Sequence, residues 1–344
     1  MAAERSAPAD KWRRLKQFWA AVGSIIAVIV ITLAILGPLP ASEAVGPPPD
    51  AIPPVALLAP PAEQPTAMQE RLPPSPPPGP FPDEALLEAG PHGPVPRIGI
   101  DGRTPMRVYS RLTEQRSDGR QRVSIVVGGL GLNAVVTEQA INQLPNATTI
   151  AFNPYAPRLR PLIDMARARG MELLLALPME SNGHPANDAG DRALLTNLLP
   201  SANEDRLLWN LSRFQGYVGV VGAIGSLRGE RFAALSDPFL TMQDHLRRRG
   251  LLYIDPRPGA RSPERAWGRS VDVVVDEPAT RREIDLKLAI LERLARERGS
   301  ALGLVGDATP VVLDRISAWF QGLEARGVVL VPVSSNIRRP ESAQ

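Results

Sequence analysis

Short apolar runs alternate with helix-like stretches along the last two thirds of the chain. The runs are rich in Val, Ile and Leu without polar alternation, and they occupy 122–128, 147–152, 171–178, 217–225, 250–255, 271–277, 301–307 and 327–333. Uninterrupted apolar runs of this length indicate strands buried on both faces, as in parallel sheets. The stretches between them, such as "REIDLKLAILERLARERG", repeat apolar residues at helical spacing. The pattern therefore predicts alternating strands and helices.

Several of the predicted helices end in glycine after arginine, as in "RARG", "RRRG", "RERG" and "EARG". A glycine just past a helix adopts the left-handed conformation that ends it, and cations in the last turn complement the helix dipole. Eight strand–helix units predict an α/β fold, a deformed (β/α) barrel with mostly parallel strands. An open doubly wound sheet is the alternative. We also expect "PMRVYSRL", before the first unit, to add a short antiparallel strand.

The N-terminal part differs sharply from this pattern. The uncharged run "FWAAVGSIIAVIVITLAIL" begins at Phe18 and is close to the roughly 20 residues that span a bilayer. Basic residues precede it and acidic ones follow, which predicts a cytoplasmic N-terminus at 1–17 and a single transmembrane anchor at 18–38. The rest of the chain is then periplasmic, on a protein of the inner membrane. A cleaved signal peptide is the alternative, because the small-residue stretch "PASEA" follows the apolar run.

Residues 39–96 are predicted to form a disordered linker. They hold more than half of the 37 prolines, in runs such as "LPPSPPPGPFP", and proline removes backbone donors and fixes φ. We expect His92 to be solvated in this linker. The remaining residues, 97–344, form the predicted barrel domain.

Composition excludes several classes of function. The chain has no cysteine, so disulfides, thiolate metal sites and cysteine nucleophiles are absent. The net charge is only +3 and the arginines are scattered, which argues against nucleic acid as a partner. There are only three histidines, His92, His184 and His245. Few imidazoles are therefore available to a metal.

In parallel α/β folds, ligands bind where the strands end. The polar or aromatic residues just after these ends are the candidate cleft residues: Asn153, Tyr155, Glu180, His184, Ser226, Asp255, Asp276 and Asp307. Acids at such positions also commonly cap the next helix. Tyr217 and Trp209 are further candidates for stacking on a sugar, although the helical spacing of Trp209 favours a place in the core.

The first strand runs into "VVGGLGLN", which offers two interpretations. Gly129, Gly131 and Ala134 satisfy the G-x-G-x-x-[GA] pattern of dinucleotide-binding loops. That fingerprint also needs an acid near the end of the second strand, and no Asp or Glu lies between Glu138 and Asp164. The predicted export also argues against a nicotinamide cofactor. The glycines therefore call for a different explanation.

The succession "IVVGGLGLN", "TTIAFNPYAP", "LLLALPME", "GYVGVVGAIGS" and "LLYID" resembles the divergent polysaccharide deacetylase family, over roughly 120–335. The resemblance implies a deformed barrel and hydrolysis of acetyl groups on cell-wall sugars. It also implies a divalent metal held by Asp and His, with an Asp base and a His acid. The positions where the family carries these residues are Gly128, Gly129, Ala176, Ala223 and Gly306 in this chain.

Glycine and alanine carry no metal-ligating side chain. We therefore expect no catalytic residue, no metal and no cofactor, and predict a glycan-binding pseudoenzyme of the cell envelope. Replacing the charged ligands by glycine is expected to widen the cleft and expose backbone N–H groups. Two alternatives stay open. One is an active deacetylase with Zn²⁺ or another divalent metal on Glu180, His184 and Asp255 or Asp276; the other is a non-enzymatic envelope scaffold.

Overall fold

The computed structural model describes Trp19, residues 81–111 and residues 120–340. The predicted transmembrane anchor and most of the predicted linker lie outside these residues. Within the described ranges, no helix is long and apolar enough to cross a membrane. The chain divides into two units, residues 1–71 and 72–344, and the description below concerns the second.

Nine parallel strands form the central sheet, in the order β8-β7-β6-β5-β4-β3-β10-β9, with β11 also paired to β3. Their bounds are β3 (Gln121–Leu130), β4 (Thr149–Phe152), β5 (Glu172–Ala176), β6 (Gly219–Val221), β7 (Leu252–Asp255), β8 (Gly268–Ser270), β9 (Val273–Val274), β10 (Ser300–Val305) and β11 (Val328–Leu330). Each of the eight predicted strand runs overlaps one of them. β8 is a strand that the sequence pattern did not indicate.

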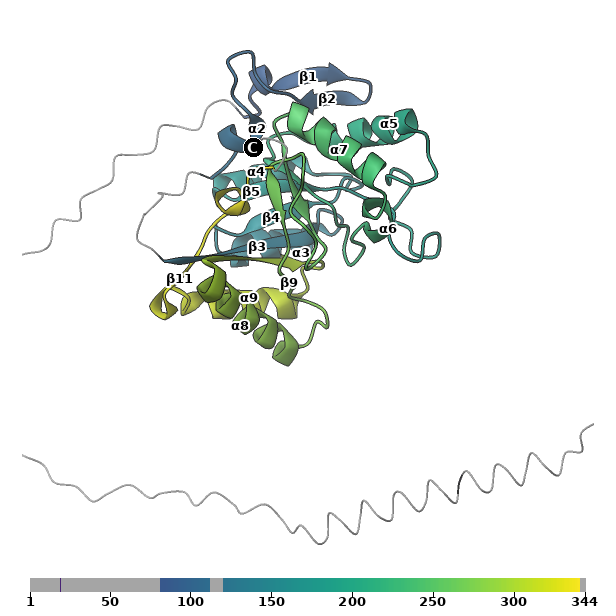
Figure 1. Ribbon diagram of the computed structural model, residues 1–344. Coiled ribbons are helices and arrows are strands. Elements are labelled where there is room, and N and C mark those ends of the chain that lie inside the picture. The colour runs from purple at the N-terminus through teal and green to yellow at the C-terminus, as the bar shows by residue number, and fades with distance from the viewer. Residues whose placement is uncertain (1–18, 20–80, 112–119, 341–344) are drawn as a thin grey trace, which may run out of the picture. The chain divides into compact units, whose positions relative to one another are not determined.

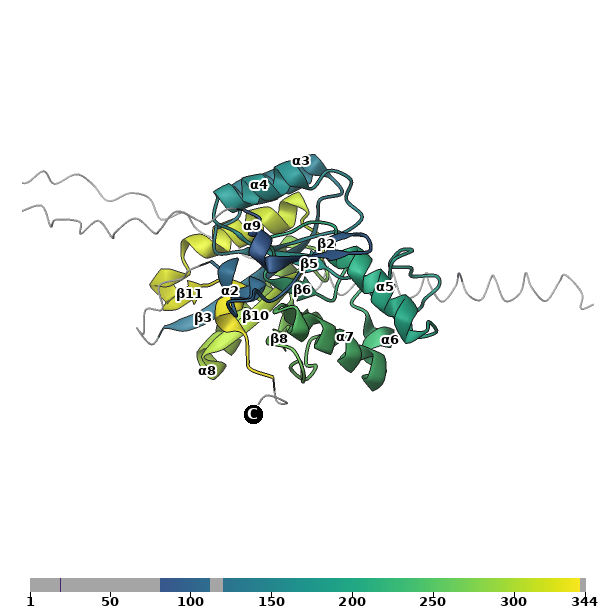
Figure 2. The same ribbon diagram turned by 90° about the horizontal axis from the view of Figure 1, so that it is seen from above.

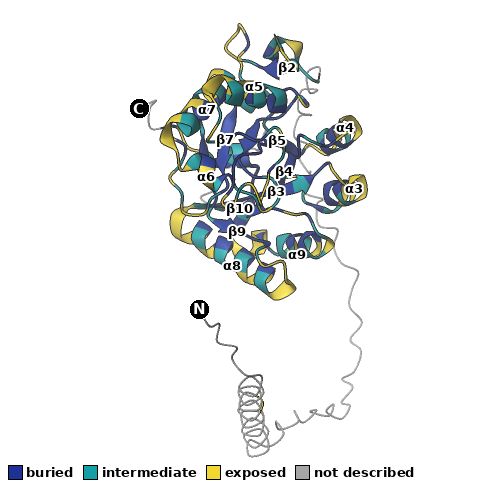
Figure 3. Cartoon of the chain, turned by 90° about the vertical axis from the view of Figure 1, so that its right-hand side faces the viewer, coloured by how far each residue is buried: buried dark blue, intermediate teal, exposed yellow. Residues whose placement is uncertain are grey.

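The sheet curls because its two edges belong to one stretch of chain. β8 pairs with β7 and β9 pairs with β10, yet β8 and β9 are consecutive. The chain passes from one edge of the sheet to the other between two consecutive residues. The Val271 N–H donates to the carbonyl oxygen of Asp255 in β7, and the Asp272 N–H donates to the carbonyl oxygen of Leu302 in β10. This arrangement fits the predicted deformed (β/α) barrel, and it does not match an open doubly wound sheet. Figure 3 shows the buried strands gathered at the centre with helices around them.

Six longer helices cover the outside of the strands: α3 (Ala134–Gln143), α4 (Arg160–Ala168), α5 (Pro200–Leu211), α7 (Ser236–Arg248), α8 (Arg281–Arg298) and α9 (Pro310–Gln321). α3 lies beside α4 on one side and α9 on the other, and α8 packs on α9 (Figures 1 and 2). Short helices α2 (Pro105–Val108) and α6 (Glu230–Ala233) and the 3-10 turns η1 (Glu84–Leu86), η2 (Glu324–Arg326) and η3 (Val333–Asn336) complete the set.

The predicted glycine stops are confirmed. Gly170, Gly250, Gly299 and Gly327 all have positive φ, between 67° and 79°. The segment "PMRVYSRL" was predicted as a strand, and this prediction is wrong. Pro105 supplies a preset φ at the start of a helix, and residues 105–108 form α2.

Residues 81–96 fold with the domain, although they were predicted to belong to the linker. β1 (Leu87–Gly90) and β2 (Gly93–Pro96) form an antiparallel hairpin next to α5. His92, expected to be solvated, lies in the hairpin turn with its Nε2 2.7 Å from Asp205 Oδ1. Two further contacts anchor the hairpin, because Arg249 binds Glu88 and the carbonyl of Pro96. The proline content alone therefore did not locate the N-terminal boundary of the folded domain.

Alternate residues of the strands face opposite layers of the core. One set packs together inside the curl, including Val126, Ala151, Leu174, Val221 and Leu304, with Val333 of η3. The neighbouring residues, such as Ile125, Val127 and Ile150, pack with the helices outside. Burial on both faces explains why the strands read as uninterrupted apolar runs.

Candidate functional site

Three glycines from separate strand ends meet backbone to backbone. Gly129 lies near the end of β3, Gly225 lies in the loop after β6, and Gly306 directly follows β10. A Cβ added to Gly129 would lie 2.9 Å from the carbonyl oxygen of Gly306, and one added to Gly306 would lie 2.8 Å from that of Gly225. We call the surface formed by the residues that follow β3, β6, β9 and β10 the strand-end mouth. Its centre is filled by main chain.

Backbone conformation also requires glycine at two of these positions. Gly129 has φ +70° and Gly225 has φ +54°, in the left-handed region that disfavours residues with a Cβ. Gly128 is less constrained, since its Cβ would meet carbonyl oxygens of Val305 and Gly306 at 3.3 Å. The expectation that glycine widens the cleft is therefore wrong. The loop after β6 and the end of β10 occupy the space instead.

Asp276 holds the end of β10 in this position. Both of its carboxylate oxygens accept the Gly306 N–H at 3.0 Å, and Oδ2 also accepts the Asp307 N–H at 2.9 Å. The side chain is only 9% exposed. Asp276 thus pairs with backbone donors, which is the usual way to satisfy a buried carboxylate.

Asp307, the residue after Gly306, is exposed. Its Oδ1 lies 3.0 Å from the Cβ position of Gly129 and 3.4 Å from that of Gly225. Desolvation, together with the negative charges of Asp276 and Glu277, raises the pKa of Asp307. It is an exposed carboxylate at the strand-end mouth.

An ion pair fastens the loop after β6 across the mouth. Arg228 Nη1 lies 2.6 Å from Glu277 Oε1, just past β9, and Arg228 Nε lies 3.7 Å from Glu230. Ser226, at the tip of the turn that joins Ile224 to Leu227, stays exposed. The role of Arg228 and Glu277 was missed from sequence. The glycines of "GAIGS" were the available signal that this loop approaches another backbone.

The other two family positions are buried and apolar. Ala176 is 3% exposed at the end of β5, and Ala223 is 6% exposed just after β6. Neither offers a donor or acceptor side chain.

Glu180 and Asp255 are engaged in local contacts. Glu180 accepts hydrogen bonds from the Thr196 N–H and hydroxyl, at 2.5 and 2.6 Å, and pairs with Arg231 at 3.0 Å. Burial opposes ionisation of Glu180, but these donors outweigh it and lower its pKa. Asp255, 1% exposed, is held by Arg257 through two side-chain hydrogen bonds of 2.9 and 2.6 Å.

Asn153 and Tyr155 also serve the local structure. The Asn153 side chain accepts the Tyr155 N–H at 2.9 Å, which closes a turn after β4. The Tyr155 hydroxyl accepts the Arg192 N–H at 3.0 Å, and its ring packs on Trp209 with centroids 5.7 Å apart. Burial raises the pKa of Tyr155 to about 12. Tyr217, a proposed stacking residue, is fully buried and cannot reach a sugar.

The predicted substitute metal site is not assembled. His184 Nδ1 is buried without a hydrogen-bond partner among the described residues, and it lies 4.0 Å from Asp188. Glu180, Asp255 and Asp276 are each saturated by the separate partners given above. Of the eight predicted cleft residues, Ser226 and Asp307 remain exposed at the strand-end mouth.

The sequence profile of divergent polysaccharide deacetylases matches residues 125–337, which is more than half of the chain. The chain belongs to the divergent polysaccharide deacetylase family.

The chain is similar to the solved structure of an uncharacterized protein from Agrobacterium tumefaciens C58, with 32% identity and a TM-score of 0.66. The match covers 71% of this chain and 99% of that protein. No curated protein matches the chain.

Two solved enzymes are more distant. The catalytic domain of a peptidoglycan N-acetylglucosamine deacetylase from Eubacterium rectale is 11% identical, with a TM-score of 0.43 over 67% of this chain and 96% of that domain. A family 4 carbohydrate esterase from Streptomyces lividans is 14% identical, with a TM-score of 0.38 over 61% and 91%.

The residues of this chain do not fit the metal that the family resemblance implies. The five family positions carry only hydrogen or methyl side chains; backbone closes in on the three glycines, and the two alanines are buried. Across the described ranges, no group of three or more His, Cys, Asp or Glu side chains is placed to hold a metal ion. No metal-dependent step can be derived for this site.

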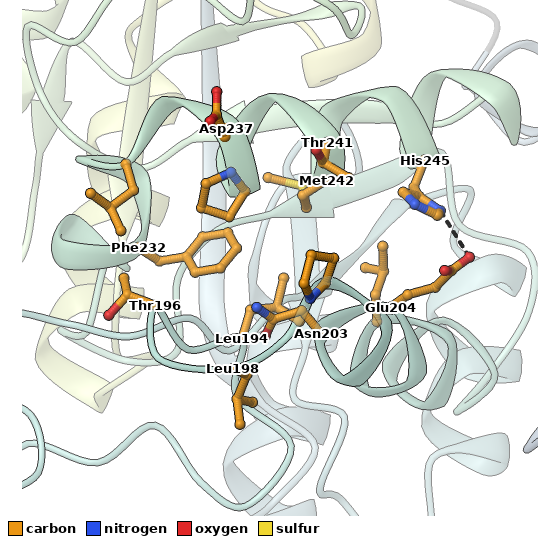
Figure 4. A pocket seen from close by; sticks show the side chains of 14 residues that line it. Leu194, Thr196, Leu198, Asn203, Glu204, Phe232, Asp237, Thr241, Met242 and His245 are labelled. Atoms are coloured by element: carbon orange, nitrogen blue, oxygen red, sulfur yellow. Dashed lines mark ion pairs between the residues drawn. The ribbon is translucent and has the colours of Figure 1, made fainter.

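A separate cavity of about 230 Å³ lies between α5, α6 and α7. Its lining is mostly apolar, with Leu207, Phe232 and Met242 among the residues drawn in Figure 4. At one end, His245 Nδ1 lies 3.7 Å from Glu204 Oε1. Burial lowers the pKa of His245, and the charge of Glu204 opposes this effect. His245 is therefore part of a cavity wall.

Proposed function

We propose that this chain is a glycan-binding pseudoenzyme of the divergent polysaccharide deacetylase family, tethered to the inner membrane with its barrel in the periplasm. The observation that carries the loss of hydrolysis is the backbone contact among Gly129, Gly225 and Gly306. An Asp or His residue at either Gly129 or Gly306 would place its Cβ less than 3.0 Å from a backbone carbonyl oxygen, which is too close. The active centre is therefore both without ligands and physically closed.

Family membership supports a saccharide as the ligand. At the strand-end mouth, Ser226 and Asp307 are exposed and offer a hydroxyl and a carboxylate to sugar hydroxyls. A carboxylate acceptor makes stronger hydrogen bonds than a neutral one. The mouth is thus suited to binding a glycan without reacting with it.

Two measurements on the full-length protein in detergent test the proposal. The first is acetate release from N-acetylglucosamine oligomers with Zn²⁺, Mn²⁺ or Co²⁺, for which we expect no turnover. Metal-dependent acetate release would establish the active-deacetylase alternative.

The second measurement is sedimentation with purified cell-wall glycan. We expect the wild type to bind, and the double variant Ser226→Ala/Asp307→Asn to bind at least about ten-fold more weakly, because it loses a charge-assisted contact. Asp237→Asn, which neutralises an exposed carboxylate at the start of α7, is the matched control and should bind like the wild type. If the wild type does not bind glycan, the scaffold alternative replaces this proposal.

A further inference from the structure

A cleft of about 420 Å³ lies outside the strand-end mouth. It opens between Phe81–Pro82, the connection from β4 to α4, and the connection from α5 to β6. Its volume is within the roughly 300–1,000 Å³ typical of small-molecule sites. Aromatic and proline side chains form much of the wall, including Phe81, Phe214 and Pro161. The cleft is large enough for one sugar unit with an attached group.

The charge of this cleft is one-sided. Arg158, Arg160 and Arg213 line it, and none of its lining residues in the described ranges is an Asp or Glu. Arg160 pairs with Asp164, one turn further along α4, at 3.0 Å. Arg158 has no ion pair with any residue in the described ranges. Three guanidinium groups thus face one neighbouring carboxylate, which leaves an excess of positive charge.

Arg213 is held in place by contacts that leave its charge uncompensated. Its Nε donates to the carbonyl oxygen of Pro154 at 3.0 Å. Its guanidinium lies 4.8 Å from the centroid of the Trp209 ring. Neither partner is an acid, and no ion pair of Arg213 occurs within 81–111 or 120–340. An arginine fixed in this way loses little side-chain entropy when it binds a ligand.

The start of α4 adds to the positive potential. The residue before the helix is Leu159, which makes no side-chain cap, and Pro161 lies in the first turn. The N-terminus of a nine-residue helix without an acceptor side chain favours a negative group nearby. This effect acts in the same direction as the arginines.

We propose that the cleft binds a saccharide that carries an oxyanion, either a carboxylate or a phosphate. Guanidinium groups bind both oxyanions through paired N–H donors, while the aromatic and proline walls contact the ring carbons. Arg158 and Arg160 belong to the chain that leaves the carboxyl end of β4. The inference rests on the proposed glycan binding for the source of the ligand, and it adds an anionic group as the determinant of recognition.

Isothermal titration calorimetry on the full-length protein in detergent tests this site. The titrants are glucuronate, glucose 6-phosphate, inorganic phosphate and glucose. The variants are Arg158→Ala, Arg213→Ala and their combination. Arg282→Ala is the matched control, because Arg282 is exposed on α8 and its removal changes the net charge equally.

We expect at least one of the two anionic sugars to bind at least about ten-fold more tightly than glucose and inorganic phosphate. Each single variant should weaken binding about ten-fold or more, as for loss of a charge-assisted hydrogen bond, and Arg282→Ala should change it less than two-fold. Comparison of glucuronate with glucose 6-phosphate identifies the carboxylate or the phosphate as the favoured group.

Several results would overturn the proposal: no binding of either anionic sugar, equal binding of glucose, or affinity unchanged in Arg158→Ala/Arg213→Ala. Inorganic phosphate binding as tightly as both anionic sugars would also do so, since the cleft walls would then contribute nothing. If neither anionic sugar binds in calorimetry while cell-wall glycan still sediments with the wild type, the cleft is refuted while the proposed function stands.

Discussion

Replacement of Gly129 by alanine tests whether the strand-end mouth is closed by backbone. The left-handed φ of +70° costs an alanine about 1–2 kcal/mol. The added Cβ would also lie 2.9 Å from the Gly306 carbonyl oxygen and 3.2 Å from the Asp307 Cα. Relief of such overpacking costs about 1–3 kcal/mol more. We expect Gly129→Ala to lower the free energy of unfolding by about 2–5 kcal/mol in total.

Gly299→Ala is the matched control. Gly299 ends α8 with φ +79°, and a Cβ there would meet nothing within 4 Å. This variant should lose only the conformational term, about 1–2 kcal/mol. Both variants are measured by urea unfolding followed by far-ultraviolet circular dichroism, with equal m-values as the check on two-state behaviour. If Gly129→Ala is no more destabilised than Gly299→Ala, the strand-end mouth is open and the argument for a closed centre fails.

Gly129→Asp extends the same test to the restored family carboxylate. The new charge would stand next to Asp307, whose Oδ1 is 3.0 Å from the Cβ position. We expect a larger loss of stability than for alanine at pH 7. Because the pKa of Asp307 is already raised, acidification protonates it more readily and should reduce the difference between the two variants. Equal differences at pH 5 and pH 7 would contradict this electrostatic reasoning.

Three further predictions concern the rest of the barrel. Burial raises the pKa of Glu172 above its usual 4.5, so the stability that its protonated form contributes is full below pH 4.5 and is lost as pH rises through the raised pKa. Glu172→Gln should therefore flatten the fall in Tm measured from pH 5 to pH 8. An unchanged slope would refute this. Asp272→Ala removes the carboxylate that lies 2.6 Å from the buried Arg269 guanidinium, and should lower the free energy of unfolding in urea by about 3–5 kcal/mol. The exposed control Asp285→Ala should lower it by less than about 1 kcal/mol. Addition of Zn²⁺ or Mn²⁺ should leave Tm unchanged in differential scanning fluorimetry, because a specific metal site would raise it by mass action.

Much of the fold was predictable because it depends on local pattern. Each of the eight apolar runs overlaps a strand, and the arginine–glycine pairs stop the helices where expected. The failures share a physical cause. β8 is only three residues long, and the hairpin at 87–96 is held by long-range contacts to Arg249 and Asp205. Such contacts leave no periodicity in the sequence.

The candidate site was predictable only in part. Order along parallel strands placed Gly129, Asp276 and Asp307 at one edge, and the structure brings them together. The sequence could not reveal which acids lack a hydrogen-bond partner, because the partners are not adjacent in the chain. Glu180, for example, accepts hydrogen bonds from Thr196. The distant ion pair from Arg228 to Glu277, and the approach of the loop after β6, were likewise invisible.

By itself, the sequence determined the family, the succession of strands and helices, and the absence of ligating side chains at five positions. Each of these depends on residue identity and local spacing. Only the tertiary structure decided that backbone atoms of neighbouring loops occupy the space beside these glycines. The distance from one backbone to another across a curled sheet is set by the packing of all its strands. The same packing gathers Arg158 and Arg213, which are far apart in the chain, around one cleft.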